Sequence, residues 1–193
     1  MKIILENICK SYNGKTVLDN FSYVFSSDTP SVIEGVSGIG KTTLLKIIMG
    51  LEEQDSGRVI FEGMTKEECR FAPVFQDTSL IPSVSAVKNV RLACRELSSD
   101  AVSKELTKLI PAPERNKKVR ELSGGTSRRV EIVRAVLASS DVLIMDEPLT
   151  GLDEENAART VSYIKENLRG RIFITSSHSD LFEKWCQRLY LPS

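Results

Sequence analysis

The sequence predicts an α/β domain built around a mostly parallel sheet. Short apolar runs alternate along the chain with segments of helical periodicity, which is the pattern of strands joined by crossover helices. A glycine-rich loop connects one of these runs to a helical segment. The run DVLIM at 141–145 is apolar throughout, as expected of a central strand covered on both faces. A chain of 193 residues is long enough for one large domain or two small ones.

The N-terminal part is rich in strands. Two strand-like segments flank Asn13-Gly14, a dipeptide typical of hairpin turns, so this part is expected to form an antiparallel β subdomain. Residues 41–50 carry leucine and isoleucine on one helical stripe, and Gly50 stands where that helix should end. Strands are expected at 2–9, 16–25, 31–35, 57–63 and 69–76.

The middle of the chain is expected to be helical. The pattern changes at about residue 77, and three prolines between there and residue 121 mark connections. A further helix should follow the stretch LSGGT, which reads locally as a loop, and should run to about residue 138. These segments predict a short helical subdomain, 77–138, inserted in a single domain that spans 1–193. A helix at 154–168, a strand at 171–177, a short helix and a last strand at 188–191 complete the expected order.

Overall charge gives no indication of a nucleic-acid partner. Basic and acidic residues balance at 26 each, so no excess of positive charge would attract a phosphate backbone. Lys117, Lys118 and Arg120 form a local basic cluster, which fits either a solvated face or a small binding patch.

The four cysteines and the single histidine make a zinc site improbable, because no CxxC pair is present. Scattered thiols are typical of a reducing compartment. The apolar runs are too short for a signal peptide or a membrane span. We therefore expect a soluble intracellular protein that reaches a membrane only through a partner.

A phosphate-binding loop is the most specific motif. GVSGIGKT, residues 35–42, has the spacing GxxxxGK[ST] and lies between a predicted strand and a predicted helix. Glycines allow successive backbone N–H groups to curl around phosphate oxygens, and the helix N-terminus adds partial positive charge. Lys41 is expected to reach the β- and γ-phosphates, and Thr42 to offer its hydroxyl to Mg²⁺. A chance glycine-rich turn would match this spacing in roughly 1% of chains of this size.

Two adjacent acids follow the apolar run at 141–145. Ligands of parallel sheets bind at the carboxyl ends of strands, where Asp146 and Glu147 stand. Because side chains alternate along a strand, the two carboxylates should point in different directions. One could hold Mg²⁺, and the other could polarise the water that attacks the γ-phosphate. A solvated loop with two acids is the alternative.

With the phosphate loop, LSGG and an apolar strand ending in Asp-Glu in this order, the chain resembles an ATP-binding cassette (ABC) ATPase over nearly its whole length. The resemblance implies a P-loop NTPase fold, with ATP and Mg²⁺ as cofactors. It implies that Tyr12 stacks on adenine, that Gln76 contacts Mg²⁺, and that His178 contacts the γ-phosphate. Tyr12 also fits ordinary turn packing, and a lone histidine often has no special role.

The resemblance assigns the remaining residues to three sets. The catalytic set is Lys41, Gln76, Glu147 and His178. The metal set is Thr42, Gln76 and Asp146. The nucleotide-binding set is Tyr12, Gly35, Ser37, Gly38, Ile39, Gly40, Lys41, Thr42, Thr43, Ser123, Gly124, Gly125 and Asp153, the last of which closes the stretch LTGLD that matches the family's D-loop.

In this family the LSGG signature covers the ATP held by a second subunit. The resemblance therefore implies a head-to-tail dimer, either of this chain or with a related ATPase subunit. Ser123 and Gly125 would present a hydroxyl and a backbone N–H to the partner's γ-phosphate, and the glycines would let the backbone come close. Thr126 stands where the signature usually has Gln.

Transport is the function that the resemblance implies. The chain would be the ATP-hydrolysing subunit of a transporter, peripheral on the inner face of the membrane through a separate transmembrane permease, with import slightly favoured. The helical insertion, which is short for the family, would carry the coupling surface. The alternatives are a soluble ABC ATPase switch without transport and a cassette that binds nucleotide without hydrolysis. Intact Lys41, Asp146, Glu147 and His178 argue against the last.

Overall fold

The computed structural model describes residues 1–191, and the chain forms two compact units. The first unit consists of residues 1–71 and 140–146 and the chain from 170 onward, and the second of residues 72–139 and 147–169. The chain passes from the first unit into the second along strand β5 (Phe71–Val74).

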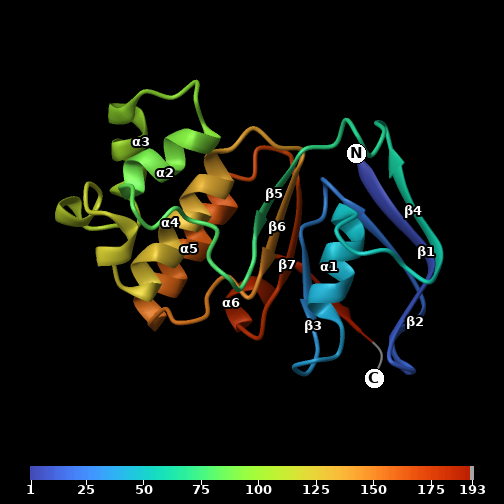
Figure 1. The fold of residues 1–193 in the computed structure, drawn as a ribbon. Coiled ribbons are helices and arrows are strands. Elements are labelled where there is room, and N and C mark those ends of the chain that lie inside the picture. Colours follow the sequence, from blue (N-terminus) through green and yellow to red (C-terminus); the bar gives the residue numbers. More distant parts are fainter. Residues whose placement is uncertain (192–193) are drawn as a thin grey trace. The chain divides into compact units, whose positions relative to one another are not determined.

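An antiparallel sheet forms the N-terminal part of the first unit (Figure 1). Its order is β2-β1-β4, with β1 at Lys2–Tyr12, β2 at Lys15–Ser26 and β4 at Ser56–Glu62. Asn13 and Gly14 have φ of 51° and 78°, the left-handed pair that a tight hairpin turn requires. Ile3, Leu5 and Ile8 of β1 are buried in the core. The expected antiparallel β subdomain is confirmed.

A parallel sheet forms the rest of the core in this unit. Four strands lie in the order β6-β7-β3-β8, and each neighbouring pair is parallel. Every residue of β6 and β7 is buried, which explains why both segments are continuous apolar runs. The bounds are β3 Ser31–Glu34, β6 Val142–Asp146, β7 Ile172–Ser176 and β8 Gln187–Tyr190.

Helix α1 (Lys41–Met49) packs leucine and isoleucine into this core and ends at Gly50, whose φ is 70°. The expected stripe and the expected stop are therefore both confirmed. A short helix α6 (Asp180–Glu183) precedes β8, as the sequence predicts.

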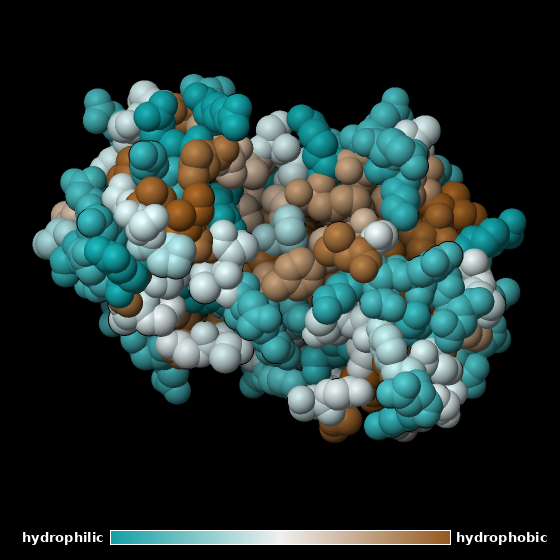
Figure 2. All heavy atoms as spheres, in the orientation of Figure 1, coloured by the Kyte–Doolittle hydropathy of each residue, from teal (hydrophilic) through white to brown (hydrophobic). Residues whose placement is uncertain are grey.

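The second unit is helical (Figure 1). Helix α4 is its longest helix, and α2, α3 and α5 pack against it or one another. The helices are α2 Ala86–Ala93, α3 Ser99–Leu106, α4 Gly124–Leu137 and α5 Glu154–Glu166, with short 3₁₀ turns at Ala112–Glu114 and Val119–Glu121. On the face in Figure 2, hydrophilic residues dominate the surface of this unit, and a few hydrophobic residues interrupt it.

Two sequence expectations for this unit are wrong. Helix does not begin near residue 77, because the buried amide of Asn89 bonds both the N–H and the carbonyl of Ile81 and holds that segment in a turn. The glycines of LSGGT are not a loop. Gly124 begins α4, and Ser123 is its N-cap, with Oγ accepting the N–H of Thr126 at 3.1 Å.

Within residues 1–191, no helix combines the length and the apolar character needed to cross a bilayer.

Candidate functional site

The phosphate loop lies in the first unit, between the end of β3 and the start of α1. Gly40 is the N-cap of α1 with φ of 117°, a backbone conformation that L side chains rarely adopt. A Cβ added there would lie 2.5 Å from the side chain of Val17 and 3.2 Å from its carbonyl oxygen. Glycine is therefore required at this position by both conformation and space.

Lys41 folds across this loop. Its Nζ donates to the carbonyl oxygen of Gly35 at 2.6 Å and to that of Val36 at 3.4 Å. It also lies 3.2 Å from Nε2 of His178. The lysine and histidine predicted to contact phosphate therefore meet in space, although 137 residues separate them.

Asp146 is the last residue of the buried strand β6, and the other four residues of that strand are apolar. Its Oδ2 accepts from Thr42 Oγ1 at 2.6 Å, and its Oδ1 accepts from Ser176 Oγ at 2.5 Å. Ser176 stands opposite Asp146 in the register of β6 and β7, so the sheet itself aligns the two side chains. The hydroxyl of Thr42 and the carboxylate of Asp146 are hard oxygen donors side by side, the kind that Mg²⁺ prefers. These two residues fit a Mg²⁺ site.

Tyr12 ends β1 on the surface of the same unit and is 41% exposed. The ammonium of Lys10 lies 5.0 Å from its ring centroid, a cation–π contact. The ring is not packed into the core, and its contact with Lys10 is also what local packing near the turn would give. Its role as an adenine platform stays a prediction.

The second unit brings Gln76 together with the signature glycines. They line one open cavity of about 820 Å³, so these segments, far apart in sequence, face the same space. The lining residues are Gln76, Asp77, Thr78, Gly124, Gly125, Ser127, Arg128, Glu131, Thr150 and Gly151.

The two signature glycines differ in what surrounds them. A Cβ at Gly125 would lie 3.1 Å from the carbonyl oxygen of Gly151 and 3.3 Å from Leu152, so the chain itself favours glycine there. A Cβ at Gly124 would meet nothing within 4 Å. Among residues 1–191, no neighbouring atom therefore requires glycine at position 124.

Thr126, the departure in the signature, is buried in a polar network. Its hydroxyl donates to Glu114 at 3.1 Å, and accepts from Ser123 Oγ at 3.0 Å and Arg129 at 3.3 Å. The side chain therefore ties the start of α4 to the 3₁₀ turn that holds Glu114.

Glu147 follows β6 with φ of 47°, in the left-handed region. A non-glycine residue there costs on the order of 1–3 kcal/mol and persists only where neighbouring groups fix it. The Arg128 guanidinium donates to its carbonyl oxygen at 3.0 Å, and the N–H of Thr150 donates to the same oxygen at 3.3 Å. The backbone of Glu147 is thus held in a strained conformation at the end of the central strand.

Asp153 caps α5. Its carboxylate accepts the N–H of Asn156 at 2.8 Å and the Asn156 amide at 2.8 Å, and these hydrogen bonds lower the pKa of the carboxyl group. Capping the helix is thus a structural role for the Asp153 carboxylate. Its contact with nucleotide stays a prediction.

The predicted residues divide between the units. In the first unit, Lys41 contacts His178 and Thr42 donates a hydrogen bond to Asp146. The first unit also holds Tyr12, Gly35, Ser37, Gly38, Ile39, Gly40 and Thr43, and the second holds Gln76, Ser123, Gly124, Gly125, Glu147 and Asp153.

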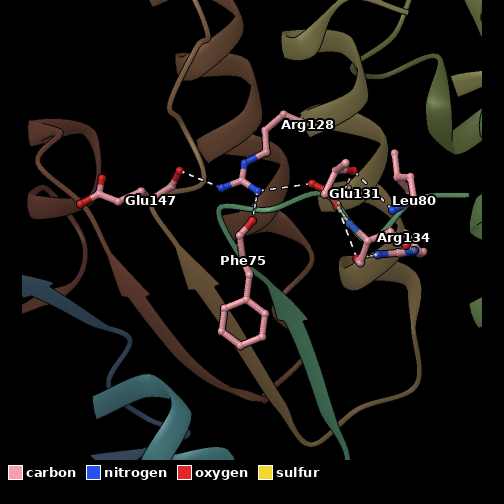
Figure 3. A network of polar contacts seen from close by, with 8 residues as sticks. Phe75, Leu80, Arg128, Glu131, Arg134 and Glu147 are labelled. Carbon is pink, nitrogen blue, oxygen red and sulfur yellow. Dashed lines mark hydrogen bonds and ion pairs between the residues drawn. The ribbon is translucent and has the colours of Figure 1, made fainter. Parts of the chain in front are cut away.

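Three residues next to the site were not predicted from the sequence. Ser176 holds Asp146, while Arg128 and Glu131 form a buried ion pair on α4 at 3.3 Å (Figure 3). The pair had a weak signal in the sequence, since opposite charges three residues apart on a helix can pair with each other. Ser176 had none, because a serine at a strand end is common.

Comparison with known proteins fits this arrangement. The family model described as ABC transporter matches residues 18–150. The spermidine/putrescine import ATP-binding protein PotA of Clostridioides difficile (strain 630) is 38% identical over 162 residues, covering 78% of this chain and 47% of the relative. The Fe(3+) ions import ATP-binding protein FbpC of Vibrio cholerae is 32% identical over 185 residues, covering 90% of this chain and 52% of the relative.

A solved dimeric bacterial ABC transporter cassette superposes with a TM-score of 0.82 at 25% identity, covering 98% of this chain and 94% of that one. The chain belongs to the ABC transporter family, and its fold is that of an ABC ATPase cassette. The chain spans about half the length of the curated relatives it matches.

Proposed function

We propose that this chain is the ATP-binding and ATP-hydrolysing subunit of an ABC transporter. The cluster of Lys41, Thr42, Asp146 and His178 carries the proposal, because it unites the predicted phosphate ligands and metal ligands at one end of a parallel sheet. The loop of glycines 35, 38 and 40 would cradle the phosphates, with Ser37, Ile39 and Thr43 beside them. Tyr12 would stack on the adenine. The chain then acts as one ATPase domain over 1–193 with the helical subdomain 77–138 inserted.

Thr42 and Asp146 would hold Mg²⁺, with Gln76 as a further oxygen ligand. When bound, the ion would neutralise charge on the β- and γ-phosphates. Asp146 is pre-aligned for this role by the hydroxyl of Ser176.

Hydrolysis would depend on Glu147 and His178. The carboxylate of Glu147 would accept a proton from the attacking water, and Lys41 and His178 would stabilise charge on the γ-phosphate. In the present hydrogen bonds Lys41 is satisfied by loop carbonyls and His178, so it must exchange these partners for phosphate oxygens when nucleotide binds.

Two copies, or this chain and a related subunit, would enclose ATP between them. Ser123, Gly124 and Gly125 would contact the nucleotide held by the partner. The surroundings of Gly124 support this, because its missing Cβ leaves open space that the chain itself does not use. The dimeric form of the superposed cassette supports it as well.

The membrane partner would be a separate permease, which would place this chain on the inner face of the membrane. The curated relatives named above are import ATP-binding proteins, which supports import, although their named cargoes differ. Ile81 and Leu92 of the helical unit are exposed by 44% and 46%, which leaves them accessible to a partner.

The test is phosphate release from ATP by the purified chain. The parent should hydrolyse Mg²⁺-ATP, and Glu147→Gln should retain nucleotide binding while turnover falls by about 10²–10⁴-fold. Turnover in Glu147→Gln equal to the parent's would contradict the proposed base.

The transport role needs its own measurement. The chain should sediment with membranes only when co-expressed with a multi-spanning permease, and Leu92→Glu should weaken that association without changing ATP binding. If the chain hydrolyses ATP but associates with no co-expressed permease, the soluble ATPase switch is favoured instead.

A further inference from the structure

A buried arginine on the signature helix contacts two segments that hold proposed catalytic residues. Arg128 lies on the second turn of α4 and its side chain is 8% exposed. Its Nη1 donates to the carbonyl oxygen of Phe75 through a short hydrogen bond, and its Nη2 donates to the carbonyl oxygen of Glu147 at 3.0 Å (Figure 3). One planar guanidinium therefore joins two backbone carbonyls.

Each carbonyl belongs to a peptide group that matters for the site. The carbonyl of Phe75 shares its peptide plane with the N–H of Gln76, so fixing one orients the other. The carbonyl of Glu147 belongs to a residue with a strained backbone, whose φ is 47°. Arg128 thus restrains the backbone at both Gln76 and Glu147.

Glu131 completes the restraint from the same helix. Its Oε2 pairs with Arg128 at 3.3 Å. Its Oε1 accepts from the N–H of Ser79 at 2.7 Å and from the hydroxyl of Thr78 at 3.0 Å. The segment from Phe75 to Ser79 is therefore held at both ends by one ion pair, and Gln76 lies between the two attachment points in the chain.

We infer that Arg128 is a positioning residue for ATP hydrolysis, which sets the backbone of Gln76 and Glu147 relative to each other through the signature helix. The inference rests on the proposed roles of those two residues. A guanidinium suits the task because its donors lie in a rigid fork, whereas a lysine ammonium is a point donor on a flexible stem. Because the arginine lies on the helix that begins with the signature, a shift at Ser123 would reach both proposed catalytic residues through it.

The test compares Arg128 with a second arginine of the same helix. Arg134 bonds Ser79, at the far end of the held segment, and does not reach Phe75 or Glu147. Arg128→Gln should lower kcat by about 10–100-fold with the Kd for ATP unchanged, because small displacements of catalytic groups cost that much. Half-maximal activity should also need more Mg²⁺. Arg134→Gln should retain the parent's kcat and Mg²⁺ dependence.

A double variant that lacks both charges serves as the control for a loss of stability. Removing Arg128 alone would leave Glu131 buried without its charge partner, so Arg128→Gln/Glu131→Gln removes both charges and should melt near the parent. Its kcat should stay as low as that of Arg128→Gln. Arg128→Lys, which keeps the positive charge without the fork, should recover stability and not kcat.

Two results would overturn the inference. One is a kcat within twofold of the parent in the folded double variant or in Arg128→Lys. The other is an equal loss in Arg134→Gln, which would show that any arginine of the helix serves. If Glu147→Gln hydrolyses ATP normally, the proposed function fails instead; if it is inactive while the Arg128 variants are active, only the inference about Arg128 fails.

Discussion

Lys41 shows how a residue can be prepared for a ligand by ordinary hydrogen bonds. It is 7% exposed, and its ammonium group contacts two loop carbonyls and a ring nitrogen of His178. The same region holds Asp146 through two hydroxyl donors. Hydrogen bonds of this kind can be exchanged for bonds to phosphate oxygens at moderate free-energy cost.

Replacing Lys41 with alanine should weaken ATP binding. Loss of hydrogen bonds between a charged donor and phosphate costs about 1.5–3 kcal/mol, so the Kd should rise by roughly 10–100-fold. Titration with a fluorescent ATP analogue measures this. Lys46→Ala is the matched control, since Lys46 is an exposed residue near the far end of the same helix. Equal affinity in Lys41→Ala and Lys46→Ala would refute the phosphate contact.

The thiols should differ in reactivity. Burial raises the pKa of Cys69 and of Cys94 to about 11, so both are protonated near neutral pH, while Cys9 is only partly buried. Native protein treated with iodoacetamide at pH 8 should therefore be alkylated mainly at Cys9, as peptide mass spectrometry would show. Unfolding in urea should make all four thiols react, and early labelling of Cys94 in native protein would contradict this order.

At the scale of elements, the sequence predicted what periodicity and turn chemistry encode. The hairpin at Asn13-Gly14, the apolar strands and the stop at Gly50 all follow from local patterns, and all are present. The start of the first helix in the helical unit could not be predicted from local patterns. The side-chain amide of Asn89 hydrogen-bonds the backbone of Ile81, eight residues earlier, and holds it in a turn. Two glycines in LSGGT indicated a loop, and the Ser123 cap and burial along α4 outweigh their poor helix propensity.

The site could be predicted as a list of residues and not as an arrangement. The phosphate-loop spacing identifies Lys41 and Thr42, and the end of an apolar strand identifies Asp146. The contact between Lys41 and His178, however, depends on how β3 and β7 pair, which no local pattern encodes. Arg128 was missed for the same reason, since its two carbonyl partners lie 53 and 19 residues away.

Helix α4 offers a test that separates capping from nucleotide contact. Ser123→Ala removes the hydroxyl that accepts the Thr126 N–H, and should lower the free energy of unfolding by about 1 kcal/mol in urea denaturation. Ser123→Asp should keep the cap and the stability, because aspartate is an equally good N-cap. Its negative charge should nevertheless slow hydrolysis by repelling the partner's γ-phosphate. Full activity in a stable Ser123→Asp variant would exclude that contact.

At the scale of the whole molecule, the family resemblance assigns the phosphate loop and the signature to two different nucleotides. The two hydrogen-bonded pairs, Lys41 with His178 and Thr42 with Asp146, belong to one unit, and the signature at the start of α4 belongs to the other. The open surroundings of Gly124 would be used only if something outside the chain approached it. Nucleotide-dependent association of two chains is the simplest arrangement that gives both features a role.

ATP should therefore convert the chain from monomer to dimer, and a hydrolysis-deficient variant should show it. Glu147→Gln at saturating Mg²⁺-ATP should elute as a dimer in size-exclusion chromatography with light scattering, and as a monomer with ADP, because the missing γ-phosphate removes the contact to Ser123 and Gly125. Adding Ser123→Arg should block dimerisation through its bulk, while the Kd for ATP measured on the monomer stays the same. Gly124→Ala is the sharper probe, since its methyl group meets nothing within the chain and should leave stability intact while it impairs the dimer. A Glu147→Gln protein that stays monomeric with bound ATP, or a Gly124→Ala variant that dimerises like its parent, would show that the signature does not face a partner's nucleotide.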